Sequence, residues 1–264
     1  MTENVTIGQY FPGNSVLHHL DPRVKILSVI LFVAAVFMME NMTESSLLIC
    51  YTIILAGLSR IPGKFLVRGL KPLWWIAVFT LGLHFFFTEG TIIWQWRFLT
   101  LTLEGLRQGI FVTLRLVLLI FMASLLTLTT SPISLTDGLE RLLSLLRPLG
   151  VPAHEIALMM TIALRFIPTL LQETDKIIKA QTSRGADFSS GNMIARLKNL
   201  VPIVVPLFVN AFRRADELAV AMEARCYRGG QGRTRMREMK IGTGDMAALL
   251  IAGGLIAGIY LLRG

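Results

Sequence analysis

Long apolar stretches, separated by short polar ones, dominate the chain and predict helices that cross a membrane. Five stretches are candidates for crossing helices, and they cover residues 26–39, 46–58, 73–87, 109–128 and 246–262. A helix needs roughly 20 apolar residues to cross a bilayer, and a shorter one can tilt or thin the bilayer locally. The pattern therefore predicts an all-α polytopic membrane protein with about five transmembrane helices.

The first crossing helix has a recognisable start signal. Asp21 can accept hydrogen bonds from the exposed backbone N–H groups, and Pro22 suits the first helical position. His18 and His19 precede this start. Neighbouring positions on a helix point about 100° apart, and no cluster of cysteines or carboxylates joins the two histidines. We therefore expect a structural role for them rather than a metal site.

The apolar pattern changes character between residues 131 and 240. Residues 135–146 alternate apolar and charged positions at helical spacing, which predicts an amphipathic helix. Two apolar runs follow, at residues 156–171 and 200–212, and each leads without a turn signal into a charged segment. Pro168 is expected to break the first run. We expect these two long helices, inserted before the last crossing, to pack against each other at the cytoplasmic face, partly in the membrane interface.

A short pattern ends both of these long helices. The segment 180–185 reads Ala-Gln-Thr-Ser-Arg-Gly, and the segment 221–226, 41 residues later, reads Ala-Met-Glu-Ala-Arg-Cys. Candidate docking residues are Ser183, Arg184, Gly185, Ala224, Arg225 and Cys226. A guanidinium offers five fixed donors, which suits carboxylates and carbonyls, so the repeat suggests one two-pronged docking surface. The alternative is that each arginine only complements the dipole of its helix.

Composition and charge agree with a membrane protein and orient it. The chain is 53% hydrophobic and 16% charged, with a mean hydropathy of +0.62 and a net charge of +9, whereas soluble domains are roughly 25% charged. Residues 60–71 carry four cations, and residues 40–44 carry none. The positive-inside rule therefore places residues 60–71 and the N-terminus in the cytoplasm and the C-terminus outside.

These assignments predict three domains. Residues 1–130 form an N-terminal membrane domain with four crossings, residues 131–240 form a cytoplasmic domain, and residues 241–264 form the last crossing helix. Arg115 is the one charge in the fourth crossing stretch. It lies near enough to the outer end of that stretch that we expect it to snorkel to the interface.

No familiar catalytic or nucleotide-binding motif is present in the sequence. The nearest approach to a phosphate-binding loop, residues 58–65, has Leu58 in place of the first glycine and Phe65 in place of serine or threonine. The sequence has no H-E-x-x-H or G-x-S-x-G motif. Cys50 and Cys226 are not expected to meet. We therefore expect no catalytic residue, no cofactor and no metal in this chain.

The N-terminal segment adds a family resemblance. The segment 8–15, Gly-Gln-Tyr-Phe-Pro-Gly-Asn-Ser, is continued by His-Leu-Asp-Pro-Arg-Val-Lys at 19–25. It resembles the N-terminal signature of the transmembrane component of energy-coupling factor transporters, the T or CbiQ-type subunit. That family carries two Ala-Arg-Gly-like motifs on coupling helices, which match residues 183–185 and 224–226. The sequence departs from the motif at Ser183, in place of alanine, and at Cys226, in place of glycine.

The resemblance implies a division of labour among several chains. Two ATP-binding-cassette ATPases would bind and hydrolyse ATP, a small membrane subunit would bind a vitamin or metal ion, and this non-catalytic chain would couple them across the plasma membrane. Arg184 and Arg225 would each insert into a groove on one ATPase. No nucleic-acid partner is expected. Two other classes stay open: a self-sufficient secondary transporter, and a membrane enzyme acting on lipid or isoprenoid substrates.

Overall fold

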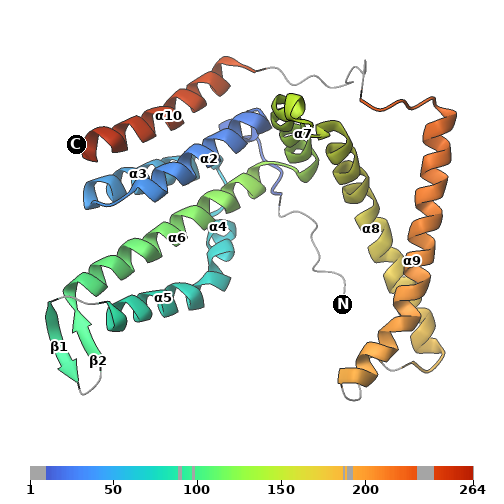
Figure 1. Ribbon diagram of the computed structural model, residues 1–264, viewed down its shortest axis with the longest axis horizontal. Coiled ribbons are helices and arrows are strands. Elements are labelled where there is room, and N and C mark those ends of the chain that lie inside the picture. The colour runs from blue at the N-terminus through green and yellow to red at the C-terminus, as the bar shows by residue number, and fades with distance from the viewer. Residues whose placement is uncertain are drawn as a thin grey trace. The chain divides into compact units, whose positions relative to one another are not determined.

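The computed structural model describes residues 10–88, 91–96, 99–186, 188, 193–230 and 241–263 (Figure 1). Its helices are α1 (Val16–His19), α2 (Pro22–Met38), α3 (Met42–Ser59), α4 (Gly63–Leu70), η1 (Lys71–Leu73), α5 (Trp74–Phe87), α6 (Leu103–Thr129), α7 (Pro132–Leu143), η2 (Ser144–Leu149), α8 (Ala153–Ser183), α9 (Met193–Ala224) and α10 (Thr243–Arg263). A small antiparallel hairpin of β1 (Ile92–Trp96) and β2 (Leu99–Thr102) joins α5 to α6. The predicted all-α fold class is confirmed, with this hairpin as a minor addition.

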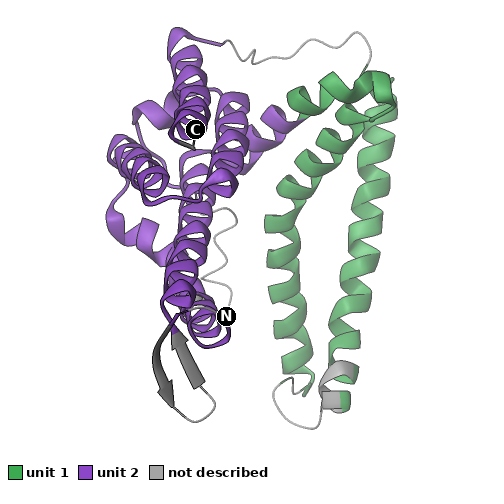
Figure 2. Ribbon diagram, turned by 60° about the vertical axis from the view of Figure 1, so that its left-hand side comes forward, with its two compact units in different colours: residues 1–7, 140–236 green, residues 8–139, 237–264 purple. Residues whose placement is uncertain are grey.

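The chain divides into two compact units, coloured separately in Figure 2. The bundle unit comprises residues 8–139 and 237–264 and contains α1 to α6 and α10. The hairpin unit comprises residues 1–7 and 140–236 and contains α8 and α9. The domain boundaries expected at residues 130 and 240 stay predictions.

The core of the bundle unit lies where α2, α3, α6 and α10 meet. Its most deeply buried large side chains are Phe32, Met39, Leu48 and Ile259. Lipid tails are as apolar as these side chains, so in a bilayer such a core is stabilised by close packing rather than by exclusion of water. The core therefore fixes which faces of the helices contact one another.

Contacts between helix ends show that the bundle helices alternate in direction. At one end, the Asp21 backbone N–H at the start of α2 donates to Asp245 at the start of α10, at 2.8 Å. At the same end, Lys25 in the first turn of α2 donates to the Thr129 carbonyl at the end of α6, at 3.1 Å. The Thr102 hydroxyl before α6 likewise donates to the Thr88 carbonyl after α5, at 2.8 Å. Helices α2, α5 and α10 thus run one way, and α3 and α6 run the other.

Within the described part of the chain, four helices are long and apolar enough to cross a membrane by length and composition, namely α3, α6, α8 and α10. The α4–α5 pair, bent by 53°, provides a fifth candidate. Helix α2, with 17 residues, is shorter than the 18 residues of the shortest candidate, α3. We include α2 among the crossing helices because it packs along α10 and α6 through the bundle core. The chain is thus a multi-pass membrane protein.

The Arg115 side chain ends at a helix terminus. Its guanidinium donates to the Met39 carbonyl and lies 5.6 Å from the centre of the Phe37 ring. The carbonyl end of a helix carries partial negative charge, which a cation stabilises. Arg115 therefore contacts the C-terminal end of α2, at the turn between α2 and α3.

In the hairpin unit, α8 and α9 run antiparallel and pack against each other (Figures 1 and 2). This confirms the predicted packing of the two long helices. The predicted break at Pro168 is wrong, because α8 continues through it as one helix of 31 residues. Helix α9 likewise continues through Pro202 and Pro206. An ion pair between Glu173 and Arg214 joins the two helices near their middle.

Candidate functional site

The first arginine motif forms the end of α8. Arg184 is the residue that caps the helix, and Gly185 follows it in the left-handed conformation, with φ of 88°. The Gly185 N–H donates to the Thr182 carbonyl and the Ala186 N–H to the Gln181 carbonyl, both at 3.0 Å. This pair of bonds defines a Schellman cap, which satisfies the last carbonyls of the helix.

The second motif forms the same cap at the end of α9. The Cys226 N–H donates to the Glu223 carbonyl at 2.8 Å, and the Tyr227 N–H donates to the Met222 carbonyl at 3.0 Å. Cys226 occupies the left-handed position, with φ of 56°, where the first motif has glycine. Arg225 therefore stands at the capping position, like Arg184. The sequence repeat thus encodes one structural device twice.

The two substituted motif positions have different consequences. Ser183 donates its hydroxyl to the Lys179 carbonyl one turn earlier, at 3.0 Å, so a serine fits the helix there as well as an alanine. Ala224 is simply the last helical residue of α9. A side chain at a left-handed position costs about 1–2 kcal/mol, so Cys226 strains the second cap.

We expect Cys226→Gly to stabilise the α9 cap by about 1 kcal/mol, because glycine adopts positive φ without steric cost. The reciprocal change, Gly185→Cys, should destabilise the α8 cap by a similar amount. Hydrogen exchange of the Tyr227 and Ala186 amides, which close the two caps, measures this locally. Equal exchange rates in the wild type and both variants would show that the left-handed positions carry no strain.

Both arginines are exposed. Among the described residues, neither guanidinium forms a hydrogen bond or an ion pair. The cation complements the negative end of its helix dipole, and its five donors still point to solvent. Each motif is thus a rigid helix tip that presents an unoccupied guanidinium.

The two tips lie at opposite ends of the hairpin, and their predicted role in docking stays a prediction. Arg225 lies two residues before Tyr227, whose hydroxyl contacts His154 at the start of α8. Arg184 lies 30 residues after His154, at the other end of α8. Thirty helical residues cover about 45 Å, so the tips lie roughly 40 Å apart, one at each end of the hairpin.

A partly buried cluster of polar side chains supports the Arg225 tip. His154, at the start of α8, contacts Glu140 at 3.1 Å through Nδ1 and the Tyr227 hydroxyl at 3.2 Å through Nε2. A side chain at Gly230 would clash with the His154 ring, at 2.7 Å. His154 thus links α7, the start of α8 and the segment after Arg225, and nothing local in the sequence marks that link.

The hairpin exposes a large apolar surface besides its two tips. The exposed apolar side chains on α8 include Met159 and Ile167, and those on α9 include Val201, Val205, Phe208 and Phe212. Phe208 and Phe212 stack one helical turn apart. Exposed apolar patches of this kind mark contacts with membrane or with another protein.

The N-terminal signature has a structural role in the bundle unit. His18 contacts the Ser15 hydroxyl at 2.6 Å and the Phe11 carbonyl at 2.9 Å, which closes the segment into a compact loop. A side chain at Gly13 would lie 3.0 Å from the His18 ring. The Phe11 N–H donates to the Leu128 carbonyl of α6, at 3.0 Å. Residues 8 and 9 of the signature lie outside the described residues.

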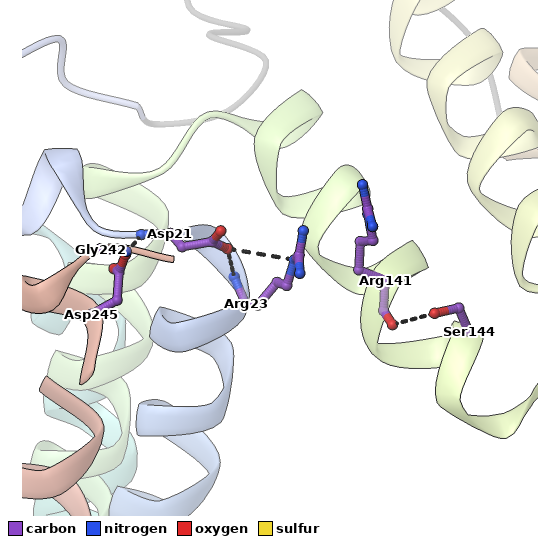
Figure 3. A network of polar contacts seen from close by, with 6 residues as sticks. All are labelled: Asp21, Arg23, Arg141, Ser144, Gly242 and Asp245. Atoms are coloured by element: carbon purple, nitrogen blue, oxygen red, sulfur yellow. Dashed lines mark hydrogen bonds and ion pairs between the residues drawn. The ribbon is translucent and has the colours of Figure 1, made fainter. Parts of the chain in front are cut away.

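The end of the signature ties three helices together, and Figure 3 shows one of these contacts, between Asp21 and Asp245. Asp21 accepts from the Arg23 N–H at 2.9 Å, which confirms the predicted start of α2. Its own N–H donates to Asp245 of α10. Lys25 is buried and donates to the Thr129 carbonyl and the Thr130 hydroxyl at the end of α6, both at 3.1 Å. The signature residues thus join α2 to α6 and α10.

Among the described residues, no group of three or more histidine, cysteine, aspartate or glutamate side chains is placed to hold a metal ion. His18 is engaged in the N-terminal loop.

Known proteins agree with the motif assignment. The family model described as "Cobalt transport protein", CbiQ, matches residues 13–236. The chain is 53% identical over 263 residues to the energy-coupling factor transporter transmembrane protein EcfT of Acidaminococcus fermentans, covering 100% of this chain and 98% of that one. It is 51% identical over 265 residues to the EcfT of Bacillus subtilis, covering 100% of both chains. The chain therefore belongs to the CbiQ family, among the transmembrane components of energy-coupling factor transporters.

Proposed function

We propose that this chain couples two ATP-binding-cassette ATPases to a substrate-binding membrane subunit and so drives uptake of a vitamin or a metal ion. The observation that carries the proposal is the pair of identical caps, each presenting an exposed arginine, at opposite ends of one helical hairpin. The names of the relatives, energy-coupling factor transporter transmembrane proteins, support it.

Each arginine serves one ATPase. The tips lie roughly 40 Å apart along the hairpin, so two separate proteins can bind without competing for one surface. A planar guanidinium on a rigid helix end suits a groove lined by carboxylates and carbonyls, because its five donors keep a fixed geometry. Arg184 and Arg225 are the contact residues, and the motif residues beside them hold the caps.

The apolar surface of α8 and α9 receives the substrate-binding subunit. Phe208, Phe212 and their neighbours on α9 are exposed in the isolated chain. A membrane-embedded partner that covered them at the cytoplasmic membrane interface would be held by burial and close packing of these side chains. The substrate itself is bound by that partner, and ATP by the ATPases.

The hairpin lies along the cytoplasmic face of the membrane, with both tips reachable from the cytoplasm. The α3–α4 connection and the start of α4 carry Arg60 and Lys64, whereas the turn between α2 and α3 carries Glu40 and Glu44. The positive-inside rule places the cationic end of the bundle unit in the cytoplasm, and the N-terminus with it. A crossing by α8 would put the two tips on opposite sides, where cytoplasmic ATPases could reach only one.

The hairpin acts as a lever between the partners. Both helices are continuous through their prolines, and the Glu173–Arg214 ion pair joins them near the middle. Closure of the two ATPases on ATP moves the tips, and the hairpin transmits this movement as a rigid-body tilt to the substrate-binding subunit. The chain itself performs no chemistry.

Reconstitution into proteoliposomes tests the proposal. We expect uptake of the substrate only when the chain, both ATPases and the substrate-binding subunit are present together with ATP. The chain alone should transport nothing, with or without an ion gradient. Uptake by the chain alone would identify a secondary transporter and would overturn the coupling role.

A further inference from the structure

A pocket of about 710 Å³ lies between α4, α5 and α6, within the bundle unit. This volume falls in the range of roughly 300–1,000 Å³ that is common for ligand sites. Its floor is apolar, formed by residues of α5 and α6 such as Ile76, Leu116 and Ile120. Neither the arginine tips nor the apolar surface of the hairpin contributes to it.

Three cations line one edge of this pocket. Lys64, Arg68 and Lys71 are spaced four and three residues apart, so they lie on one face of α4 and its 3₁₀ extension η1. All three side chains are exposed. Among the described residues, none of them forms an ion pair, and no carboxylate lines the pocket. The edge therefore carries uncompensated positive charge.

The pocket lies at the depth of the lipid headgroups. Trp74 and Trp75, at the start of α5, are 69% and 80% exposed, and exposed tryptophans gather at the membrane–water interface. Helix α4 is bent by 53° from α5, so when α5 crosses the bilayer, α4 lies closer to the membrane plane. Gly69 holds α4 tightly on α6, since a side chain there would clash with Ser124 at 2.6 Å.

We propose that this pocket binds one anionic diacyl phospholipid, with its phosphate on Lys64, Arg68 and Lys71 and an acyl chain on the apolar floor. Basic pockets between transmembrane helices recognise anionic headgroups in this way. The combination of cations, an interfacial position and an apolar floor distinguishes this ligand from a free anion, which would gain nothing from the floor. The bound lipid would hold α4 against α5 and α6.

Native mass spectrometry of the full-length chain tests the site. The detergent-solubilised chain is mixed with equimolar phosphatidylglycerol and phosphatidylcholine that share the same acyl chains. It is then released from the detergent micelle in the mass spectrometer. Each cation near a headgroup favours an anionic lipid several-fold, so we expect the wild type to retain phosphatidylglycerol over phosphatidylcholine by about tenfold or more. No preference in the wild type would overturn the proposal.

Variants locate the lipid. The triple variant Lys64→Gln, Arg68→Gln, Lys71→Gln should lose the preference, whereas Arg60→Gln, which removes a nearby cation that does not line the pocket, should keep it. Ala77→Phe fills the pocket without altering charge and should reduce the bound lipid about as strongly. Retention of the preference by the triple variant or by Ala77→Phe would place the lipid elsewhere and contradict the proposal.

A headgroup without chains distinguishes a lipid site from a phosphate site. Glycerol phosphate in large excess should leave the bound phosphatidylglycerol in place, because it cannot use the apolar floor. Displacement by glycerol phosphate would show a simple anion site and would overturn the lipid assignment. An unchanged thermal unfolding midpoint for each variant, measured in the same detergent, shows that the fold is intact.

Discussion

A chain that carries Arg184→Glu together with Arg225→Glu is expected to support no ATP-driven uptake above the background seen without ATPases. Both guanidiniums are exposed, and each forms the tip of a capped helix. Truncating one partner of a hydrogen-bonded charge pair in an interface costs about 2–5 kcal/mol, and reversal adds repulsion. With both tips reversed, neither ATPase is held. Initial rates of substrate uptake by the reconstituted complex measure the effect.

Matched variants separate docking from general charge effects. Arg213→Glu reverses an exposed arginine of the same hairpin that does not lie in a cap, and uptake should stay near the wild-type rate. Arg184→Lys keeps the charge but loses the planar arrangement of donors, so it should give a partial loss. A double variant of Arg184 and Arg225 with wild-type uptake would rule out both arginines as contacts.

Lys25→Ala is expected to destabilise the bundle unit by about 3–5 kcal/mol, the range typical for removing one partner from a buried charged cluster. Lys25 is 7% exposed and donates to acceptors at the end of α6. Asp21 and Asp245 are also buried, so the loss of the cation leaves two buried carboxylates poorly compensated. The thermal unfolding midpoint of the purified chain in detergent measures the loss.

Lys176→Ala provides the control, because Lys176 is exposed on α8, and its removal should leave the midpoint almost unchanged. Asp245→Asn keeps an acceptor for the Asp21 N–H but removes one charge. Its unfolding midpoint should therefore lie between those of Lys25→Ala and Lys176→Ala. If Lys25→Ala unfolds at the same temperature as the wild type, the signature does not hold α2, α6 and α10 together.

Local features of the fold could be predicted from the sequence because their causes are local. Asp21 and Pro22 mark the start of α2, and the observed cap uses the Asp21 side chain. The 41-residue repeat likewise produces two equal caps, since a Schellman cap depends only on the last residues of a helix and the two that follow. The apolar runs identified the bundle helices for the same reason.

The separation of the two tips could not be predicted from the sequence, because it depends on where α9 begins. The second apolar run starts at residue 200, and the sixteen residues 184–199 could reach roughly 53 Å when extended, enough for a parallel or an antiparallel pair. In the structure α9 begins at Met193, so nine residues, 184–192, connect the two helices. They reach roughly 30 Å, less than the length of α9, about 48 Å, and the helices run antiparallel.

Contacts between distant residues could not be predicted in this way. Asp21 and Asp245 are 224 residues apart in the chain, and His154 and Tyr227 are 73 apart. No periodicity or capping signal links such pairs, because their meeting depends on how whole helices pack. Pro168 shows the reverse error, since a proline that usually breaks a helix is accommodated within α8.

The mass of the detergent-solubilised complex tests the coupling role most directly. The chain is expressed with the ATPase subunits of its own genome, as wild type, as Arg213→Glu and as the double variant Arg184→Glu, Arg225→Glu. We expect wild type and Arg213→Glu to retain two ATPases and the double variant to retain none. A wild-type chain that holds no ATPase, or a double variant that holds both, would contradict the assignment of the two helix tips as the ATPase contacts.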